Sequence, residues 1–311
     1  MIKNKTLIIG FGRMGISHAS QLGLILRNSD IYVYDPSFKV KVLIIVLSLF
    51  TRIRYTNIGT KSDMSGFDHI FITSPPKYQE NYFNRIKDKN TKIFVEKPIN
   101  IQNILNLNEL PKNIYVGYVM QHVEAFMLLK KVLNGRNCSS AYILMETNSD
   151  LTNAHGWRAN SFDGSIVSEY GSHMLNLFSF ITEQECLIKS SRIDKKNQID
   201  LDLELKSQLT TGLLVLKYNS KNVRKTNYSV KIRCDDDIFE ADLYSFKING
   251  VTKFELSQEK SKTNTYLRGA EFSRQMENFL DNNNFSESLR LALSTKEALY
   301  DYKKKFDNTW R

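Results

Sequence analysis

The sequence has few cysteines and no long apolar run, and both shortages narrow the kinds of protein that it can encode. The three cysteines of the 311-residue chain, Cys138, Cys186 and Cys234, are far apart and form no C-x-x-C pair. This spacing favours neither a disulfide framework nor a metal site such as zinc. It is typical of a reducing, cytoplasmic compartment, which is the location that we expect.

No apolar stretch is long enough to span a bilayer, which needs about 20 apolar residues. The longest runs from Val40 to Phe50 and is interrupted by Lys41 and Ser48. We interpret it as a buried helix after the second strand. It is more apolar than a surface helix should be, so an oligomer contact or a membrane-surface contact stays open. The N-terminal apolar run is too short for a signal peptide and is typical of a first strand.

Acidic residues are fewer than basic ones, 33 against 43, and the formal net charge is +10. The basic residues are spread along the whole chain and form no stripe with interleaved aromatics. We therefore expect no nucleic-acid partner, although a basic surface would help to attract an anionic substrate. The hydrophobic fraction, 41%, is that of an ordinary globular protein. We find no internal repeat, low-complexity tract or flexible linker.

The first 120 residues alternate short apolar strands with helical segments, which predicts an α/β domain with a doubly wound parallel sheet of the Rossmann type. The expected strands are Leu7–Ile9, Ile31–Tyr34, Arg52–Tyr55, His69–Thr73, Lys92–Val95 and Ile114–Tyr118.

From residue 121 to 311 the pattern becomes that of an α+β domain. Segments such as 199–206, 230–234 and 239–243 alternate apolar and charged residues, as in an antiparallel sheet that is covered on one face. Glu124–Asn134 and two C-terminal segments have helical periodicity, and the sequence leaves open whether the C-terminal helix returns to the first domain.

The glycine-rich segment near the N-terminus predicts a dinucleotide site. A short strand leads into G-x-G-x-x-G, and Asp35 follows 20 residues after Gly15 at the end of the next strand. Gly10 would permit the tight turn, Gly12 would let a pyrophosphate approach, and Gly15 would pack the helix closely. Asp35 would accept hydrogen bonds from the adenosine ribose. A chance glycine-rich turn in another α/β protein is the alternative.

Two further segments follow the fourth and fifth expected strands, where ligands of doubly wound sheets bind. The first is T-S-P-P, residues 73–76, and the second is E-K-P, residues 96–98. Lys97 would donate a hydrogen bond to a substrate oxygen and stabilise negative charge on it. Taken alone, the first segment has a rigid turn as its alternative interpretation, and Lys97 is more typical of an ordinary surface lysine.

A third segment, residues 164–176, contains Glu169 and His173 at helical spacing. A carboxylate one turn from an imidazole orients it and raises its basicity, which makes His173 a candidate general base. A surface Glu–His pair on an ordinary helix is the alternative.

The four motifs together, in this order and spacing, resemble the Gfo/Idh/MocA family of NAD(P)-dependent oxidoreductases over residues 5–181. The resemblance implies a Rossmann domain followed by a domain with a large, mostly antiparallel open sheet. It implies that Lys97 lies near nicotinamide and substrate, that His173 accepts the proton, and that Glu169 is the acid of the helix. The open sheet face often forms dimers or tetramers in this family, so we expect a homodimer or homotetramer.

The sequence departs from the family pattern at four positions of the site. Ser74 replaces a frequent threonine, Gln79 a frequent histidine, Gln121 a frequent arginine and Asn176 a frequent aspartate. These changes alter the expected polar lining of the substrate pocket. They also keep open a non-catalytic sensor or scaffold that binds a nicotinamide nucleotide.

The resulting hypothesis is an NAD-dependent oxidoreductase that acts on a secondary hydroxyl or ketone of a sugar, cyclitol or nucleotide sugar. NAD is favoured over NADP because Asp35 would repel a 2′-phosphate. The expected cofactor residues are Gly10, Phe11, Gly12, Arg13, Met14, Gly15, Asp35, Thr73, Ser74, Pro75, Glu96 and Lys97. The expected substrate residues are Gln121, His122, Trp157, Arg158 and Asn176.

Overall fold

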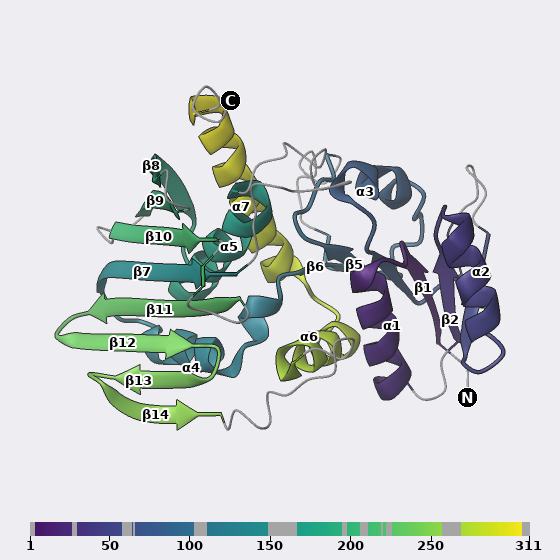
Figure 1. Ribbon diagram of the computed structural model, residues 1–311, viewed down its shortest axis with the longest axis horizontal. Helices are drawn as coiled ribbons and strands as arrows, with labels where there is room; N and C mark the ends of the chain where they lie inside the picture. The colour runs from purple at the N-terminus through teal and green to yellow at the C-terminus, as the bar shows by residue number, and fades with distance from the viewer. Residues whose placement is uncertain are drawn as a thin grey trace. The chain divides into compact units, whose positions relative to one another are not determined.

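The structure is a computed structural model of the chain, and the chain divides into two compact units (Figure 1). One unit comprises residues 1–117 and 262–290, and the other comprises residues 118–261 and 291–311. The structure describes residues 4–26, 30–57, 64, 66–102, 111–148, 167–194, 198–205, 211–218, 220–221, 226–256 and 269–306.

The first unit is built on a six-stranded parallel sheet with the order β3-β2-β1-β4-β5-β6. Its strands are β1 (Lys5–Ile9), β2 (Asp30–Tyr34), β3 (Ile53–Tyr55), β4 (His69–Ile72), β5 (Lys92–Glu96) and β6 (Ile114–Gly117). Each matches an expected strand to within two residues. Because the order reverses between β1 and β4, the carboxyl ends of these two strands form the switch point where ligands of such sheets bind. The predicted Rossmann fold is confirmed.

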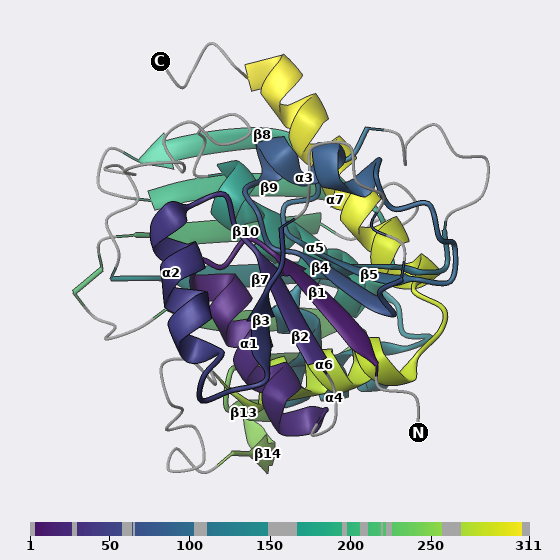
Figure 2. The ribbon, with the colours of Figure 1, turned by 90° about the vertical axis from the view of Figure 1, so that its right-hand side faces the viewer.

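Helices α1 (Arg13–Ile25), α2 (Phe38–Leu47), α3 (Pro76–Phe83) and α6 (Ala270–Asp281) accompany this sheet. One core cluster joins α1, α2 and α6 to the same face of β1, β2, β4, β5 and β6. Figure 2 shows α1 and α2 side by side over the strands. Phe279 of α6 lies against the rings of Phe71, Phe94 and Tyr115. A segment far along the chain therefore completes the core of this unit.

Helix α2 begins and ends close to the expected apolar segment, but the expectation that it is buried is wrong. Ile44 is the one residue of α2 that is fully buried. Val40 and Leu47 lie on the same side and pack against the core. Apart from the half-buried Lys41, the other residues of the helix are exposed, because only one side of α2 packs against the core.

The second unit contains an eight-stranded sheet with the order β14-β13-β12-β11-β7-β10-β9-β8. Its strands are β7 (Cys138–Glu146), β8 (Cys186–Asp194), β9 (Gln198–Leu205), β10 (Thr211–Lys217), β11 (Asn227–Cys234), β12 (Asp237–Asp242), β13 (Ser245–Ile248) and β14 (Val251–Glu255). Only β7 and β10 pair in parallel, so the expected, mostly antiparallel sheet is confirmed.

One face of this sheet is covered by helices, and its core includes residues of α4, α5 and α7. The helical elements are the short η2 (Val119–His122), α4 (Glu124–Leu133), the π-helical turn η4 (Val167–Gly171), α5 (Ser172–Thr182) and α7 (Ser286–Phe306). Gly135 follows α4 with a φ of +77°, which a glycine adopts without strain, so the expected end of this helix is confirmed. Among the described residues, no helix is long and apolar enough to cross a membrane.

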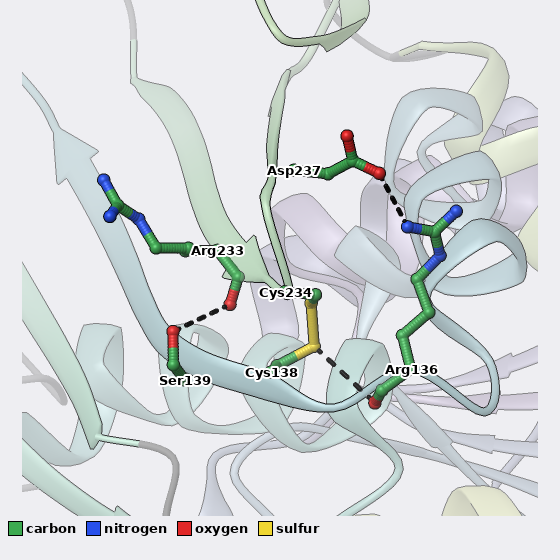
Figure 3. The surroundings of a disulfide bond; sticks show 6 residues. All are labelled: Arg136, Cys138, Ser139, Arg233, Cys234 and Asp237. Carbon is green, nitrogen blue, oxygen red and sulfur yellow. Dashed lines mark hydrogen bonds and ion pairs between the residues drawn. A yellow bond between two sulfur atoms is a disulfide. The ribbon is translucent and has the colours of Figure 1, made fainter.

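The expectation that the cysteines form no disulfide is wrong for one pair. Cys138 of β7 and Cys234 of β11 are joined by a disulfide, with their Cα atoms 3.9 Å apart (Figure 3). These residues are 96 positions apart in the sequence, and the pairing of β7 with β11 makes them neighbours. Cys186 lies outside the bond and is buried. The spacing of cysteines along a chain does not report such cross-strand neighbours.

Candidate active site

The glycine-rich turn lies between β1 and α1. Side chains at Gly10 and Gly15 would clash with the neighbouring backbone of this turn. Gly10 has a φ of +91°, and a Cβ there would lie 3.0 Å from the backbone nitrogen of Ser74. A Cβ on Gly15 would lie 2.1 Å from the carbonyl oxygen of Gly10. A Cβ on Gly12 would meet no atom within 4 Å, so the space beside this residue is open at the start of α1.

Asp35 ties the end of β2 to this turn. Its carboxylate accepts hydrogen bonds from the backbone N–H of Phe11 at 2.7 Å and from that of Ser37 at 2.8 Å. The Phe11 side chain points into the core rather than outward. Arg13 is exposed and Met14 half-buried in the first turn of α1, where backbone N–H groups are available to an anion.

The T-S-P-P segment lies beside the same turn, at the carboxyl end of β4. The Thr73 hydroxyl donates toward the carbonyl oxygens of Ile9 at 3.0 Å and Gly10 at 2.5 Å, so it holds the turn in place. Ser74 is buried, and its Oγ has no hydrogen-bond partner among the described residues. Pro75 precedes the first residue of α3.

These observations fit a bound dinucleotide. The open space at Gly12, the helix N-terminus and the unpartnered Ser74 hydroxyl lie around one turn, and a buried hydroxyl without a partner costs free energy until a ligand satisfies it. The Asp35 carboxylate has further lone pairs with which it would accept bonds from ribose hydroxyls.

The E-K-P segment follows β5 and is held by a buried amide. Gln79 of α3 is fully buried, and its Nε2 donates to the carbonyl oxygens of Glu96 at 2.7 Å and Pro98 at 3.3 Å. Its Oε1 accepts from the backbone N–H of Asn100 at 2.7 Å. The Lys97–Pro98 peptide bond is cis. Gln79 therefore contacts the chain on both sides of Lys97.

Glu96 makes a buried contact with a histidine of the first helix. Its Oε1 lies 2.7 Å from Nε2 of His18, which is 2% exposed. The His18 ring also lies against the rings of Phe71 and Phe94. The Glu96 carboxylate is thus bonded within the protein, and Lys97, which is half-buried, is the next residue along the chain.

In the second unit, His173 is the second residue of α5 and lies between two aromatic rings. The ring of Tyr118 is 6.0 Å away and perpendicular to it, and the ring of Tyr228 is 6.5 Å away. Burial raises the pKa of both tyrosines, so their phenol groups stay protonated at neutral pH. Tyr118 is hydrogen-bonded to Ser172, the neighbour of His173. These contacts restrict the position of the imidazole.

Two of the departures from the family pattern are hydrogen-bonded to each other. Gln121 donates through Nε2 to Oδ1 of Asn176 at 2.7 Å, and both residues are buried. Asn176 also donates to the hydroxyl of Thr295 at 3.4 Å. His122, the neighbour of Gln121, is 8% exposed. Gln121 and Asn176 are thus neutral residues that share one hydrogen bond.

Three of the expected site residues fall wholly or partly outside the description. Trp157 and Arg158 lie outside the described residues, and only the backbone of Glu169 is described, in η4.

Within the described ranges, no cluster of three metal-binding side chains occurs. The second unit has a hollow of about 380 Å³ on the exposed face of its sheet, and its lining includes none of the expected site residues.

Three residues that the sequence reasoning did not select contribute to these arrangements: His18, Tyr118 and Tyr228. His18 follows Gly15 by three residues and lies on the side of α1 that faces the sheet, a signal that the sequence offers. No pattern singles out the two tyrosines, because they come from segments more than 100 residues apart.

No protein-family model and no curated protein matches the sequence. Many solved structures match the fold. Over 94–98% of its length, the chain shares its fold with solved structures that are described as dehydrogenases or oxidoreductases.

Three of these structures are described as dehydrogenases or as complexes with NAD. Myo-inositol dehydrogenase from Lactobacillus casei, in complex with NAD(H) and myo-inositol, matches with a TM-score of 0.71 and 14% identity, over 97% of this chain and 95% of that one. GenD2 from gentamicin A biosynthesis, in complex with NAD, matches at 0.68 and 14%, over 96% and 94%. UDP-N-acetylglucosamine 3-dehydrogenase GnnA from Acidithiobacillus ferrooxidans matches at 0.66 and 15%, over 96% and 97%.

Proposed function

We propose that the protein is an NAD-dependent oxidoreductase of the Gfo/Idh/MocA type that acts on a secondary hydroxyl or ketone. The glycine turn carries the proposal, because open space at Gly12, the Ser74 hydroxyl and the Asp35 carboxylate form the set of groups that a dinucleotide requires. The similarity in fold to structures solved with NAD supports it. When bound, the nicotinamide supplies the hydride acceptor or donor of the reaction.

The protein's own residues would manage the proton and the substrate oxygen. In the direction of oxidation, the carbon–hydrogen bond of the alcohol breaks with transfer of hydride, and His173 accepts the hydroxyl proton. Lys97 donates a hydrogen bond to the same oxygen and stabilises its partial negative charge. Glu169 orients His173 or contacts the substrate. Glu96, which is bonded to His18, and Gln79 hold the segment that contains Lys97.

The proposed substrates are sugars, cyclitols and nucleotide sugars. The related structures include enzymes that are described as acting on myo-inositol and UDP-N-acetylglucosamine. The proposed substrate residues are Gln121, His122, Trp157, Arg158 and Asn176. Because Gln121 and Asn176 are neutral, they favour hydroxyl groups over a charged group at the part of the substrate that they contact.

NAD is the proposed cofactor because Asp35 places a carboxylate at the end of β2, where it would repel a 2′-phosphate. The two hydrogen bonds that the Asp35 carboxylate accepts from backbone N–H groups fix its position, so it would not readily rotate away from a 2′-phosphate. We also propose a homodimer or homotetramer through the exposed sheet face of the second unit. The Cys138–Cys234 disulfide removes the cysteine-based argument for a cytoplasmic location, so no location is proposed.

A titration of the purified protein with NADH and NADPH, followed by nicotinamide fluorescence, tests the cofactor. We expect tighter binding of NADH, and comparable binding of NADPH would contradict the preference. Addition of sugars, cyclitols and nucleotide sugars to the NAD and NADH complexes then tests turnover.

Lys97→Ala and His173→Ala test the catalytic roles. Each is expected to reduce turnover by about 100-fold or more while NADH binding stays largely intact. Lys89→Ala, at an exposed lysine of the same unit, is the matched control and should leave turnover unchanged. Near-normal turnover of either variant would refute its role. Tight NADH binding without turnover over the whole panel would instead favour the sensor.

A further inference from the structure

The outward side of α2 and the residues that follow it form an apolar surface that the proposed reaction does not use. Its large side chains are between 45% and 83% exposed, and they are Phe38, Val42, Leu43, Ile45, Val46, Leu49 and Phe50. We call these residues, with the cations named below, the α2 surface. Figure 1 shows α2 beside β2. Helix α2 also contacts β3, the edge strand of its sheet.

The fold of the first unit does not require these side chains to be apolar. The opposite side of the helix, with Val40, Ile44 and Leu47, already packs against the core. A helix that is apolar on both sides is expected in a fully buried position or in contact with lipid. Contiguous exposed apolar surface of this kind marks an interaction site.

The charge of the α2 surface is of one sign. Lys39, Lys41, Arg52 and Arg54 flank the apolar residues, and residues 36–62 contain no aspartate or glutamate. Arg54 donates to the backbone carbonyl oxygens of Ser48 at 3.0 Å and Thr51 at 2.7 Å, which are neutral acceptors. Lys41 lies over the ring of Tyr55, 5.1 Å from its centroid. The surface is therefore cationic as well as apolar, and its charge is complementary to an anionic partner.

The apolar part of the α2 surface, between its flanking cations, offers few groups for the hydrogen bonds that protein partners use. Ser48 is the only polar residue from Val42 to Phe50, and its hydroxyl donates to the carbonyl oxygen of Ile45 at 2.6 Å. Protein interfaces carry about one hydrogen bond per 100–200 Å² and are enriched in tyrosine and tryptophan. Five of the seven apolar side chains are aliphatic and lack the flat faces that stack on nucleic-acid bases.

A second copy of the chain is a poorer match than an anionic surface. In a two-fold contact the same patch lies on both sides, which would place these cations against the same cations. The net charge of +10 makes the rest of the molecular surface positive on average as well.

We propose that the α2 surface docks the protein on a bilayer that contains anionic lipids. Helix α2 has 10 residues and is too short to span a bilayer, so it would lie in the plane of the interface. The aliphatic and phenylalanine side chains enter the boundary between headgroups and acyl chains, while the four cations contact anionic headgroups. Such docking would place the proposed enzyme next to membrane-associated substrates, although the binding itself does not depend on the proposed function.

Co-sedimentation of the full chain with vesicles tests the proposal. One set of vesicles contains phosphatidylcholine alone, and in the other a third of the lipid is phosphatidylglycerol. We expect binding to the anionic vesicles that weakens at high salt, and little binding to the neutral ones. The double variant Leu49→Ser and Phe50→Ser should lower the partition coefficient about tenfold or more.

Matched controls distinguish the contribution of the α2 surface to vesicle binding from that of exposed apolar or positively charged residues elsewhere on the protein. Val251→Ser with Tyr300→Ser changes two exposed apolar residues elsewhere, which are 58% and 67% exposed, and it should leave vesicle binding unchanged. Lys39→Glu should weaken binding to anionic vesicles, whereas Lys253→Glu, on the exposed β14, should not. Thermal melting and NADH affinity show whether each variant is folded.

Three outcomes would overturn the proposal. The first is no binding to anionic vesicles, and the second is equal binding by wild type and the Leu49/Phe50 variant. The third is a wild-type oligomer that this variant converts to monomers without any vesicle binding, which would make the surface a contact between copies. A catalytically inactive protein that still binds vesicles through α2 would refute the proposed function and leave this inference standing.

Discussion

Gln79→Ala is expected to destabilise the first unit and to disturb the segment that contains Lys97. The variant removes two short hydrogen bonds. In one, Nε2 of Gln79 donates to the carbonyl oxygen of Glu96, and in the other, Oε1 of Gln79 accepts from the backbone N–H of Asn100. Because Gln79 is fully buried, both backbone groups would lose their partner in a site with little access for water. Each such loss costs about 1–3 kcal/mol, so we expect the free energy of unfolding to fall by about 2–6 kcal/mol.

Urea unfolding with an unchanged m-value measures this loss. Lys77→Ala changes an exposed residue of the same helix and should alter the free energy of unfolding by about 0.5 kcal/mol or less. If substrate turnover is established, Gln79→Ala should lower kcat more than it weakens NADH binding, because the displaced segment contains Lys97. A fall in unfolding free energy of less than about 1 kcal/mol would refute the view that Gln79 holds this segment.

Two further predictions concern stability. Burial lowers the pKa of His69 from 6.5 to about 4. Between these pH values the unfolded state therefore binds more protons than the folded state. The free energy of unfolding should fall by up to about 3 kcal/mol as the pH drops through this window. Urea unfolding at several pH values checks this, and a His69→Asn variant with the same pH dependence would refute the assignment. The bond between Cys138 and Cys234 closes a loop of 96 residues, so its reduction should lower the free energy of unfolding by about 4–5 kcal/mol. Thiol titration of the denatured, non-reduced protein should find one thiol per chain, and three would show that the bond does not form.

The order of elements in the first unit could be predicted from the sequence because its signals are local. Each strand from β1 to β6 is a short apolar run with a turn or helix on either side, and this alternation is sufficient to predict a parallel sheet. The glycine turn and Asp35 were found in the same way, since both follow directly from a strand. Periodicity of two likewise predicted β9, β11 and β12.

Features that depend on pairing between distant segments could not be predicted. Cys138 and Cys234 become neighbours only through the pairing of β7 with β11, and no local pattern sets that register. The exposure of α2 depends on whether any other element covers its outer side, and apolar composition alone favours burial. The role of Gln79 requires the E-K-P segment to pass next to α3, which is a property of the folded sheet.

The pair formed by Gln121 and Asn176 shows why departures from a family pattern are better interpreted together. In the sequence they are two separate changes, 55 positions apart, and each one removes an expected charge from the substrate pocket. In the structure they satisfy each other through one buried hydrogen bond, so neither leaves an unpaired polar group. Changing only one of them to an ionised residue would bury a charge opposite a neutral amide, at a cost of several kcal/mol. The two positions are therefore constrained as a unit, and a charge at one of them would require a compensating change at the other.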